Sequence, residues 1–247
     1  MLTNARTKLI KSLKLKKNRK HEGLFVVEGE KNVLELLDSD FSIHSLYATG
    51  DFLDTHARVL NRREIESVAC SKKQLTSIST FKSNEQALSV VKIKKNQQLK
   101  ADDNEFALIL DELKDPGNLG TIIRICDWYG INKIVASEST VDLYNPKVIS
   151  ASMGSFLRIQ IYYCELFQFM QQNEGHYLGA YMKGSDVHSY SFGSGGYIVL
   201  GNESNGISES IAPFINQKIS IPSYGSAESL NVGVAAAIIL DNLKREH

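Results

Sequence analysis

The stretch FALILDELKDPGNLGTIIR, residues 106–124, decides how the C-terminal part of this chain folds. Its first five residues are continuously apolar, which is typical of a strand buried on both faces of a parallel sheet. Residues 115–118 have turn chemistry, and apolar residues at i, i+3, i+4 and i+7 from Leu119 then predict a helix that Gly130 ends. The stretch therefore predicts a strand-to-helix junction, where open α/β sheets bind ligands.

Outward from this stretch, strands and helices continue to alternate. The pattern predicts further C-terminal elements: strands at 132–136, 157–162, 177–181, 197–200 and 218–221, and a helix at 229–244. It also predicts N-terminal elements: strands at 24–27, 43–47, 67–70 and 87–93, and helices at 31–37, 52–60 and 72–78. The chain is thus expected to be an α/β protein whose sheets are covered by helices.

The composition changes at a polar stretch, residues 96–104, which has the character of a linker. We therefore expect a small α/β domain at residues 1–95 and a parallel-sheet domain at residues 105–247. The 247 residues suffice for two such domains.

Composition excludes several classes of protein. With 43% hydrophobic and 23% charged residues the chain is of the soluble globular type, and it has no apolar run near the ~20 residues that cross a bilayer. Its start lacks the apolar segment of a secretory signal, although an acid-free organellar presequence at residues 1–20 remains an alternative. Cys70, Cys126 and Cys164 are isolated and the histidines are scattered, which predicts a reducing, cytoplasmic setting and no metal site.

The net charge of zero hides an asymmetry. Residues 1–100 hold 19 Lys and Arg against 11 Asp and Glu, and the excess is concentrated in residues 1–20. A basic cluster attracts a polyanion, whereas the alternative is a solvated chain end. The candidate RNA-binding residues are Lys14, Lys16, Lys17, Arg19 and Lys20.

Three C-terminal segments carry polar side chains at element boundaries. In the first, Asn118 and Arg124 belong to an N-x-G-x-x-x-R pattern at the start of a helix, where N–H groups favour an anion. A helix cap followed by a surface arginine is the alternative. The second, NPKVISASMGS at 145–155, is rich in small residues, and by itself it is better explained as a packed helix that ends in a glycine turn.

The third segment is the longest. YIVLGNESNG at 197–206 is a strand followed by a turn, and ISIP at 219–222 precedes SLNV at 229–232. Ser229 is the expected N-cap of the last helix. Boundaries leave backbone donors and acceptors unpaired, and these suit a nucleoside ligand.

Together these segments resemble the SpoU, or TrmH-like, branch of the SPOUT methyltransferases, the knotted RNA ribose 2′-O-methyltransferases. The resemblance spans residues 106–245 and includes L-x-x-x-x-D-P-G-N-L-G-x-x-x-R, A-S-x-G-S, L-G-N-E-x-x-G, I-P and S-L-N-V in order. The N-terminal part, with its basic residues followed by GLFVVEG at 23–29, is similar to the substrate-binding domain often fused to this branch.

The resemblance implies a deep trefoil knot in the C-terminal domain, S-adenosylmethionine as cofactor, a homodimer and no metal. The implied cofactor-binding residues are Leu200, Gly201, Ile221, Pro222 and Leu230. The implied catalytic set is Asn118, Arg124, Glu203, Ser229 and Asn231. Because a free guanidinium keeps its proton at neutral pH, we assign Arg124 to binding a phosphate and polarising the 2′-hydroxyl.

The sequence therefore predicts an enzyme that methylates a ribose 2′-hydroxyl of RNA. Ribosomal RNA is preferred because of the N-terminal domain, and the alternatives are a transfer RNA methyltransferase or a non-catalytic RNA-binding protein. A Rossmann enzyme is disfavoured, because the glycines at 193–196 precede a strand, whereas a dinucleotide fingerprint follows one.

Overall fold

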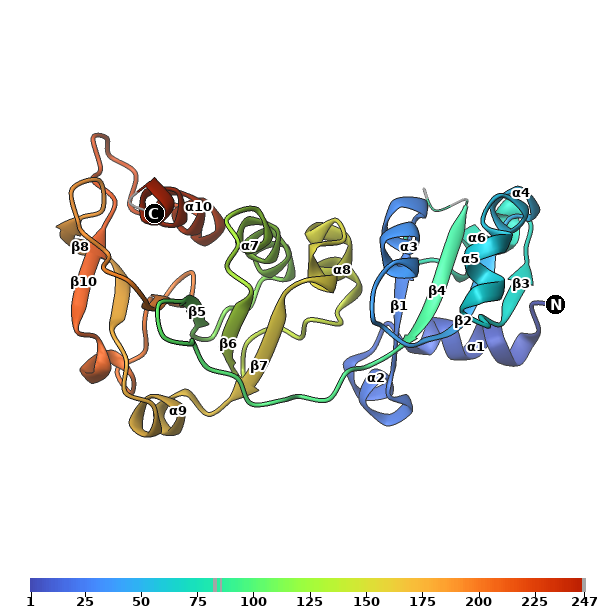
Figure 1. Ribbon diagram of the computed structural model, residues 1–247, viewed down its shortest axis with the longest axis horizontal. Helices are drawn as coiled ribbons and strands as arrows, with labels where there is room; N and C mark the ends of the chain where they lie inside the picture. The colour runs from blue at the N-terminus through green and yellow to red at the C-terminus, as the bar shows by residue number, and fades with distance from the viewer. Residues whose placement is uncertain (82–83, 85, 246–247) are drawn as a thin grey trace. The chain divides into compact units, whose positions relative to one another are not determined.

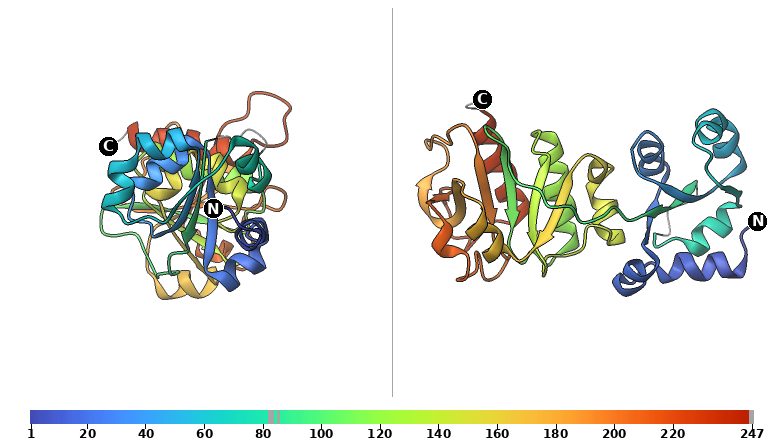
Figure 2. Two further views of the ribbon diagram at one scale, coloured as in Figure 1. Left: turned by 90° about the vertical axis from the view of Figure 1, so that its right-hand side faces the viewer. Right: turned by 60° about the horizontal axis from the view of Figure 1, so that its bottom comes forward.

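Two sheets organise the chain in the computed structural model, which describes residues 1–81, 84 and 86–245 (Figures 1 and 2). Unit 1 consists of Met1–Lys95 and Asp142–Leu157, and unit 2 of Asn96–Val141 with residues 158–245. Within these described residues no helix has the length and apolarity needed to span a membrane.

Unit 2 is built on a six-stranded sheet in which every neighbouring pair is parallel, as expected. Its order is β10-β8-β9-β5-β6-β7. The strands are β5 (Phe106–Leu110), β6 (Lys133–Ser137), β7 (Gln160–Cys164), β8 (Tyr177–Asp186), β9 (Gly196–Leu200) and β10 (Gln217–Ser220). From β5 the chain adds strands first on one side and then on the other, so β5 and β9 meet at the switch point of the sheet.

Three helices cover this sheet. α7 (Pro116–Trp128) and α10 (Val232–Arg245) lie side by side on one face, and α9 (Leu166–Gln172) lies on the other (Figure 1). The predicted stripe of α7 is buried, and α9 packs Phe169 and Met170 into the cluster that contains Ala107 and Val135. Burial of both faces explains why β5 has no polar residue.

Unit 1 has a smaller, mixed sheet of order β1-β4-β2-β3. Its strands are β1 (Leu24–Glu28), β2 (Ile43–Ala48), β3 (Ser67–Ala69) and β4 (Ala87–Lys92). Its helices are α1 (Asn4–Ser12), α2 (Lys16–Glu22), α3 (Glu30–Leu37), α4 (Gly50–Thr55), α5 (Ala57–Arg62), α6 (Lys72–Ile78) and α8 (Pro146–Ser152).

β1 alternates between the two faces of this sheet. Val26 packs with Ile10 of α1 and Leu75 of α6, whereas Phe25 turns to the opposite face. There the Phe25 ring lies 4.5 Å from that of Tyr144 and 6.2 Å from that of Phe156, between ring centroids. These contacts explain why Asp142–Leu157 groups with the N-terminal residues, although we expected residues 105–247 to form one domain.

Arg19 has a structural role that differs from our expectation. Its residue is 2% exposed, and its guanidinium donates to the carbonyl oxygens of Leu13 and Lys14 and to the Asp142 carboxylate at 2.6 Å. A guanidinium that is buried and engaged in this way is not available to RNA, which corrects the prediction for Arg19. Lys14, Lys16, Lys17 and Lys20 remain exposed.

Several predicted boundaries were wrong. The expected helix at 52–60 is divided into α4 and α5, and the strand expected from 157 begins at Gln160, because residues 155–157 form a 3-10 turn that buries Phe156. The last helix begins at Val232 rather than Ser229. Its cap is Asn231, whose Oδ1 accepts from the N–H groups of Gly233 and Val234 at 2.9 and 3.3 Å.

Candidate active site

The carboxyl ends of β5 and β9 bring two of the polar segments together. Leu110 pairs with Leu200, so the chain leaves both strands at the same level of the sheet. Segments that are distant in sequence, at 111–118 and 201–206, consequently lie beside each other. This position is the edge of a parallel sheet at which ligands bind.

Glu203 is the centre of a hydrogen-bonded cluster at this edge. Its Oε1 accepts from the Asn118 Nδ2 at 3.0 Å and from the Asp115 amide at 3.3 Å, and its Oε2 accepts from the Lys114 amide at 3.5 Å. The Asp115 side chain in turn caps α7 by accepting from the Asn118 amide at 2.8 Å. A carboxylate placed against the first turn of α7 also has the favourable sign for the helix dipole.

Asn231 extends the cluster to the start of α10. Its Nδ2 donates to the Asn118 Oδ1 at 2.9 Å, while its own Oδ1 caps α10. The order Glu203–Asn118–Asn231 therefore links the N-termini of α7 and α10 through side chains alone. Three residues that the sequence predicted for one site are in direct contact.

Glu203 is held in its charged form. Burial by itself raises the pKa of this carboxyl, but the hydrogen bonds from Asn118 and from backbone amides outweigh burial, and its pKa lies below the ordinary value. Glu203 is thus an acceptor at neutral pH. It orients Asn118 and the loop before α7 rather than donating a proton.

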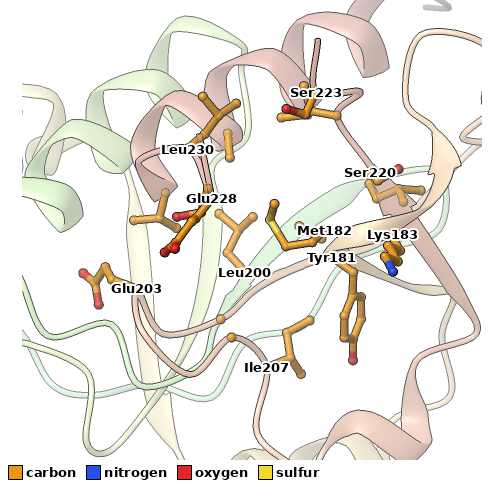
Figure 3. Close-up of a pocket in the computed structure, with 18 of the residues that line it drawn as sticks. Tyr181, Met182, Lys183, Leu200, Glu203, Ile207, Ser220, Ser223, Glu228 and Leu230 are labelled. Carbon is orange, nitrogen blue, oxygen red and sulfur yellow. The ribbon is translucent and has the colours of Figure 1, made fainter. Parts of the chain in front are cut away.

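A cavity of about 880 Å³ lies next to this cluster, between the middle of β8, the ends of β9 and β10 and the first turns of α10 (Figure 3). In Figure 3 Leu200, Ile207 and Leu230 surround the space and Glu203 lies at its edge. The structure places all five predicted cofactor residues on its wall: Leu200, Gly201, Ile221, Pro222 and Leu230. Ser229 also lines it.

Gly201 is required for the shape of this wall. A Cβ atom at this position would lie 2.1 Å from the carbonyl carbon of Gly206 and 2.3 Å from the Ile207 amide nitrogen. Because both contacts are to backbone, no side-chain movement relieves them. The backbone at residue 201 lies this close to the backbone at residues 206 and 207 only because residue 201 has no side chain.

Arg124 is separate from the cluster. It is exposed on α7, it does not line the cavity, and the described part of the chain offers its guanidinium no hydrogen bond or ion pair. The 145–155 segment is also absent from the cluster, since it forms α8 and the turn after it in unit 1. There Gly154 faces the Glu35 carboxylate, which a Cβ atom would approach to 2.2 Å.

Sequence reasoning missed the groups that shape the loop before α7. Glu112 adopts a left-handed φ of 56°, its amide donates to the Ser137 Oγ at 2.9 Å, and its carbonyl accepts from the Asn202 Nδ2 at 2.9 Å. Ser137 is the last residue of β6 and Thr140 follows the strand, and neither gave a pattern that linked it to this loop. The residues described by the structure contain no group of three His, Cys, Asp or Glu side chains suited to a metal ion.

Solved structures share this fold over the whole chain. An AdoMet-bound rRNA methyltransferase from Sinorhizobium meliloti is 27% identical, with a TM-score of 0.90 over 100% of this chain and 96% of its own. A putative RNA methyltransferase of the TrmH family from Porphyromonas gingivalis is 29% identical, with a TM-score of 0.87 over 100% of both chains.

A curated relative has a similar extent. The 23S rRNA (guanosine(2553)-2′-O)-methyltransferase RlmP of Bacillus subtilis is 27% identical over 98% of this chain and 96% of its own length. Residues 4–89 also match the model of the MRM3-like substrate binding domain.

The all-parallel sheet, the cavity at its switch point and the cluster beside it define a methyltransferase of the SPOUT class. The chain belongs to the SpoU rRNA Methylase family, whose model matches residues 105–241. The resemblance stated from the sequence motifs is thereby confirmed.

Gly201→Ala is expected to weaken S-adenosylmethionine binding at least about 10-fold and to lower the free energy of unfolding by about 1–3 kcal/mol, because the added methyl group collides with backbone. Isothermal titration and urea denaturation measure the two effects. Gly225→Ala is the matched control, since a Cβ atom there meets nothing within 4 Å. Wild-type affinity in Gly201→Ala would show that this turn does not hold the cofactor.

Proposed function

We propose that this chain transfers the methyl group of S-adenosylmethionine to a ribose 2′-hydroxyl of ribosomal RNA. The observation that carries the proposal is the contact of Glu203, Asn118 and Asn231 beside a cavity walled by the predicted cofactor residues. The named activities of the relatives and the AdoMet-bound relative from Sinorhizobium meliloti support the same chemistry.

The residues that line the cavity fit this cofactor. Leu200, Ile221 and Leu230 offer apolar surface to an adenosine, and the chain ends of β9 and β10 offer backbone donors and acceptors. When bound, S-adenosylmethionine supplies an activated methyl group on a sulfonium, so the reaction needs no metal. The cluster beside the cavity is where the chain holds the acceptor ribose.

The chain's own residues have separate tasks in this proposal. Asn118, oriented by Glu203, and Asn231 position the ribose, together with Ser229 at the cavity wall. Arg124 binds the adjoining phosphate and polarises the 2′-hydroxyl, for which a partner-free, exposed guanidinium is suited. Alignment of the two reactants is worth several kcal/mol, up to about 7–11 in favourable cases.

Arg124→Ala is expected to lower the rate of methyl transfer at least about 100-fold while cofactor affinity stays within about 3-fold, because Arg124 contacts the substrate and not the cavity. Transfer of labelled methyl groups to ribosomal RNA, followed by mapping of alkali-resistant riboses, measures the rate and the product. Transfer RNA is the parallel substrate. Near-normal turnover in this variant would rule out the assignment of Arg124, and absence of transfer by the wild type would rule out the function.

Unit 1 is proposed to bind the RNA through its basic segment. Lys16, Lys17 and Lys20 are exposed on α2, and Lys14 is exposed in the turn between α1 and α2, next to an exposed Leu15. The Lys14 Nζ also donates to the Ser79 carbonyl at 3.3 Å, so the other three are the freer contacts. We keep the division at 1–95, 96–104 and 105–247 as a proposal for the boundaries along the sequence, whereas by contacts residues 142–157 group with the N-terminal unit.

The triple variant Lys16→Ala, Lys17→Ala, Lys20→Ala is expected to reduce the slope of log K against log salt by about 2–3, because each phosphate contact contributes about 0.7–0.9. Fluorescence anisotropy with an RNA fragment at several salt concentrations measures this slope. Replacing the exposed Lys31, Lys100 and Lys244 in the same way is the control. An unchanged slope would mean that the basic segment is only solvated.

A homodimer is the expected assembly, and α7 and α10 present the surface for it. Trp128 is 83% exposed on α7, and Val234 is 48% exposed on the neighbouring α10. A second copy of this surface is the occupant we propose, because pairing would remove both side chains from water.

The trefoil knot stays a prediction, which tracing the chain path in a crystal structure tests. A cytoplasmic location also stays a prediction. It suits the free Cys70, Cys126 and Cys164, and cell fractionation tests it.

Trp128→Ser is expected to convert a dimer into a monomer, because it deletes the largest apolar group of this surface. Sedimentation velocity distinguishes twice the chain mass of 27.5 kDa from the single mass. Phe167→Ser, on α9 at the opposite face of the sheet, should remain dimeric. A wild-type chain that sediments as a monomer would contradict the proposal.

A further inference from the structure

Asn202 joins the two loops that leave the switch point of the sheet. It lies two residues after the end of β9, opposite Glu112, which lies two residues after the end of β5. The Asn202 Nδ2 donates to the Glu112 carbonyl oxygen at 2.9 Å. Its Oδ1 accepts from the amides of Ser204 and Asn205 at 2.9 and 3.1 Å. One carboxamide thus bonds both to its own turn and to the neighbouring loop.

The turn that Asn202 organises is closed by its backbone as well. The amide of Asn202 donates to the Gly206 carbonyl and the Gly206 amide donates to the Asn202 carbonyl, both at 2.9 Å. This turn lines the cavity and carries Glu203. Its shape therefore determines where the Glu203 carboxylate is placed.

The partner of Asn202 on the other loop is held in an unusual conformation. Glu112 has a φ of 56°, a left-handed conformation that a residue with a side chain rarely adopts. The Ser137 hydroxyl and the Asn202 amide fix its N–H and its carbonyl, respectively. This loop leads directly to Lys114 and Asp115, whose amides donate to Glu203. Strain maintained by surrounding hydrogen bonds is characteristic of functional loops.

We propose that Asn202 is a positioning residue for methyl transfer, which presupposes the function proposed above. Its amide group ties the cofactor-side turn to the substrate-side loop, and this tie holds Glu203 against Asn118 and the first turn of α7. The position requires a donor and an acceptor on one short side chain. Aspartate offers only acceptors when ionised, and would set a carboxylate oxygen against the Glu112 carbonyl.

Asn202→Asp breaks the bond to Glu112, because it keeps the two acceptor bonds inside the turn but replaces the donor with a carboxylate oxygen that repels the Glu112 carbonyl. We expect kcat to fall about 10-fold or more through misalignment, with KM and Kd for S-adenosylmethionine within about 3-fold. Asn104→Asp introduces the same charge at an exposed site of unit 2 and should leave kcat unchanged. Equal kcat in Asn202→Asp and wild type would overturn the proposal.

A double-mutant cycle shows whether Asn202 acts through Glu203. If it does, Asn202→Asp combined with Glu203→Gln is no slower than Glu203→Gln alone. Multiplied losses would mean that Asn202 acts independently of Glu203, and would overturn the positioning role as stated. If Asn202→Asp only destabilises the fold, it lowers the melting temperature equally in the wild type and in Glu203→Gln, and it slows methyl transfer in both.

Hydrogen exchange separates this proposal from the proposed function. Asn202→Asp is expected to accelerate exchange of the Lys114 and Asp115 amides at least about 5-fold, whether or not RNA is methylated. Unchanged exchange overturns the tie, whereas faster exchange in a chain that methylates no RNA overturns only the function. If Asn202→Asp does not fold, Asn202→Ser replaces it, because a serine hydroxyl still accepts within the turn but does not reach Glu112.

Discussion

The in-register parallel pairing of β5 with β9 is the constraint on which the site depends. Leu110 lies opposite Leu200, so the two following loops begin at one level and run side by side. A shift of this register by one residue would turn the apolar side chains of β9 to the wrong face and move Glu203 away from Asn118. The cluster, the cavity wall and the tie at Asn202 all follow from this one pairing.

Some polar groups at this edge cap helices and orient other side chains, whereas others face the cavity or solvent. Asp115 and Asn231 cap the helices α7 and α10, and their caps fix the two helix starts that Asn118 connects. Glu203, kept ionised by the hydrogen bonds it accepts, orients Asn118. Ser229 lines the cavity, and Arg124 stays exposed and without a partner among the described residues. The hydrogen-bonded groups thus lie beside the cavity, whereas the Arg124 guanidinium faces solvent.

Unit 1 shows how far charge patterns in a sequence can be trusted. The residues of the basic segment have the same charge in the sequence but differ in burial. The buried Arg19 donates to two carbonyl oxygens and to Asp142, whereas Lys16, Lys17 and Lys20 are exposed to solvent. Arginine suits the buried place because its planar guanidinium donates in several directions at once. The partner Asp142 is 123 residues away, and no local pattern could have revealed it.

The sequence by itself determined the α/β class, the strand–turn–helix units and the membership of the three motif segments in one family, because these depend on periodicity and on residues at fixed spacing. Tertiary structure decided which residues meet. It brings Asn118, Glu203 and Asn231 into contact and links Asn202 to Glu112. It also starts α10 at Val232, where the sequence predicted Ser229, and groups residues 142–157 with the N-terminal residues. The physical reason is that strand order and register, which a sequence does not record locally, bring together residues 85 to 113 positions apart.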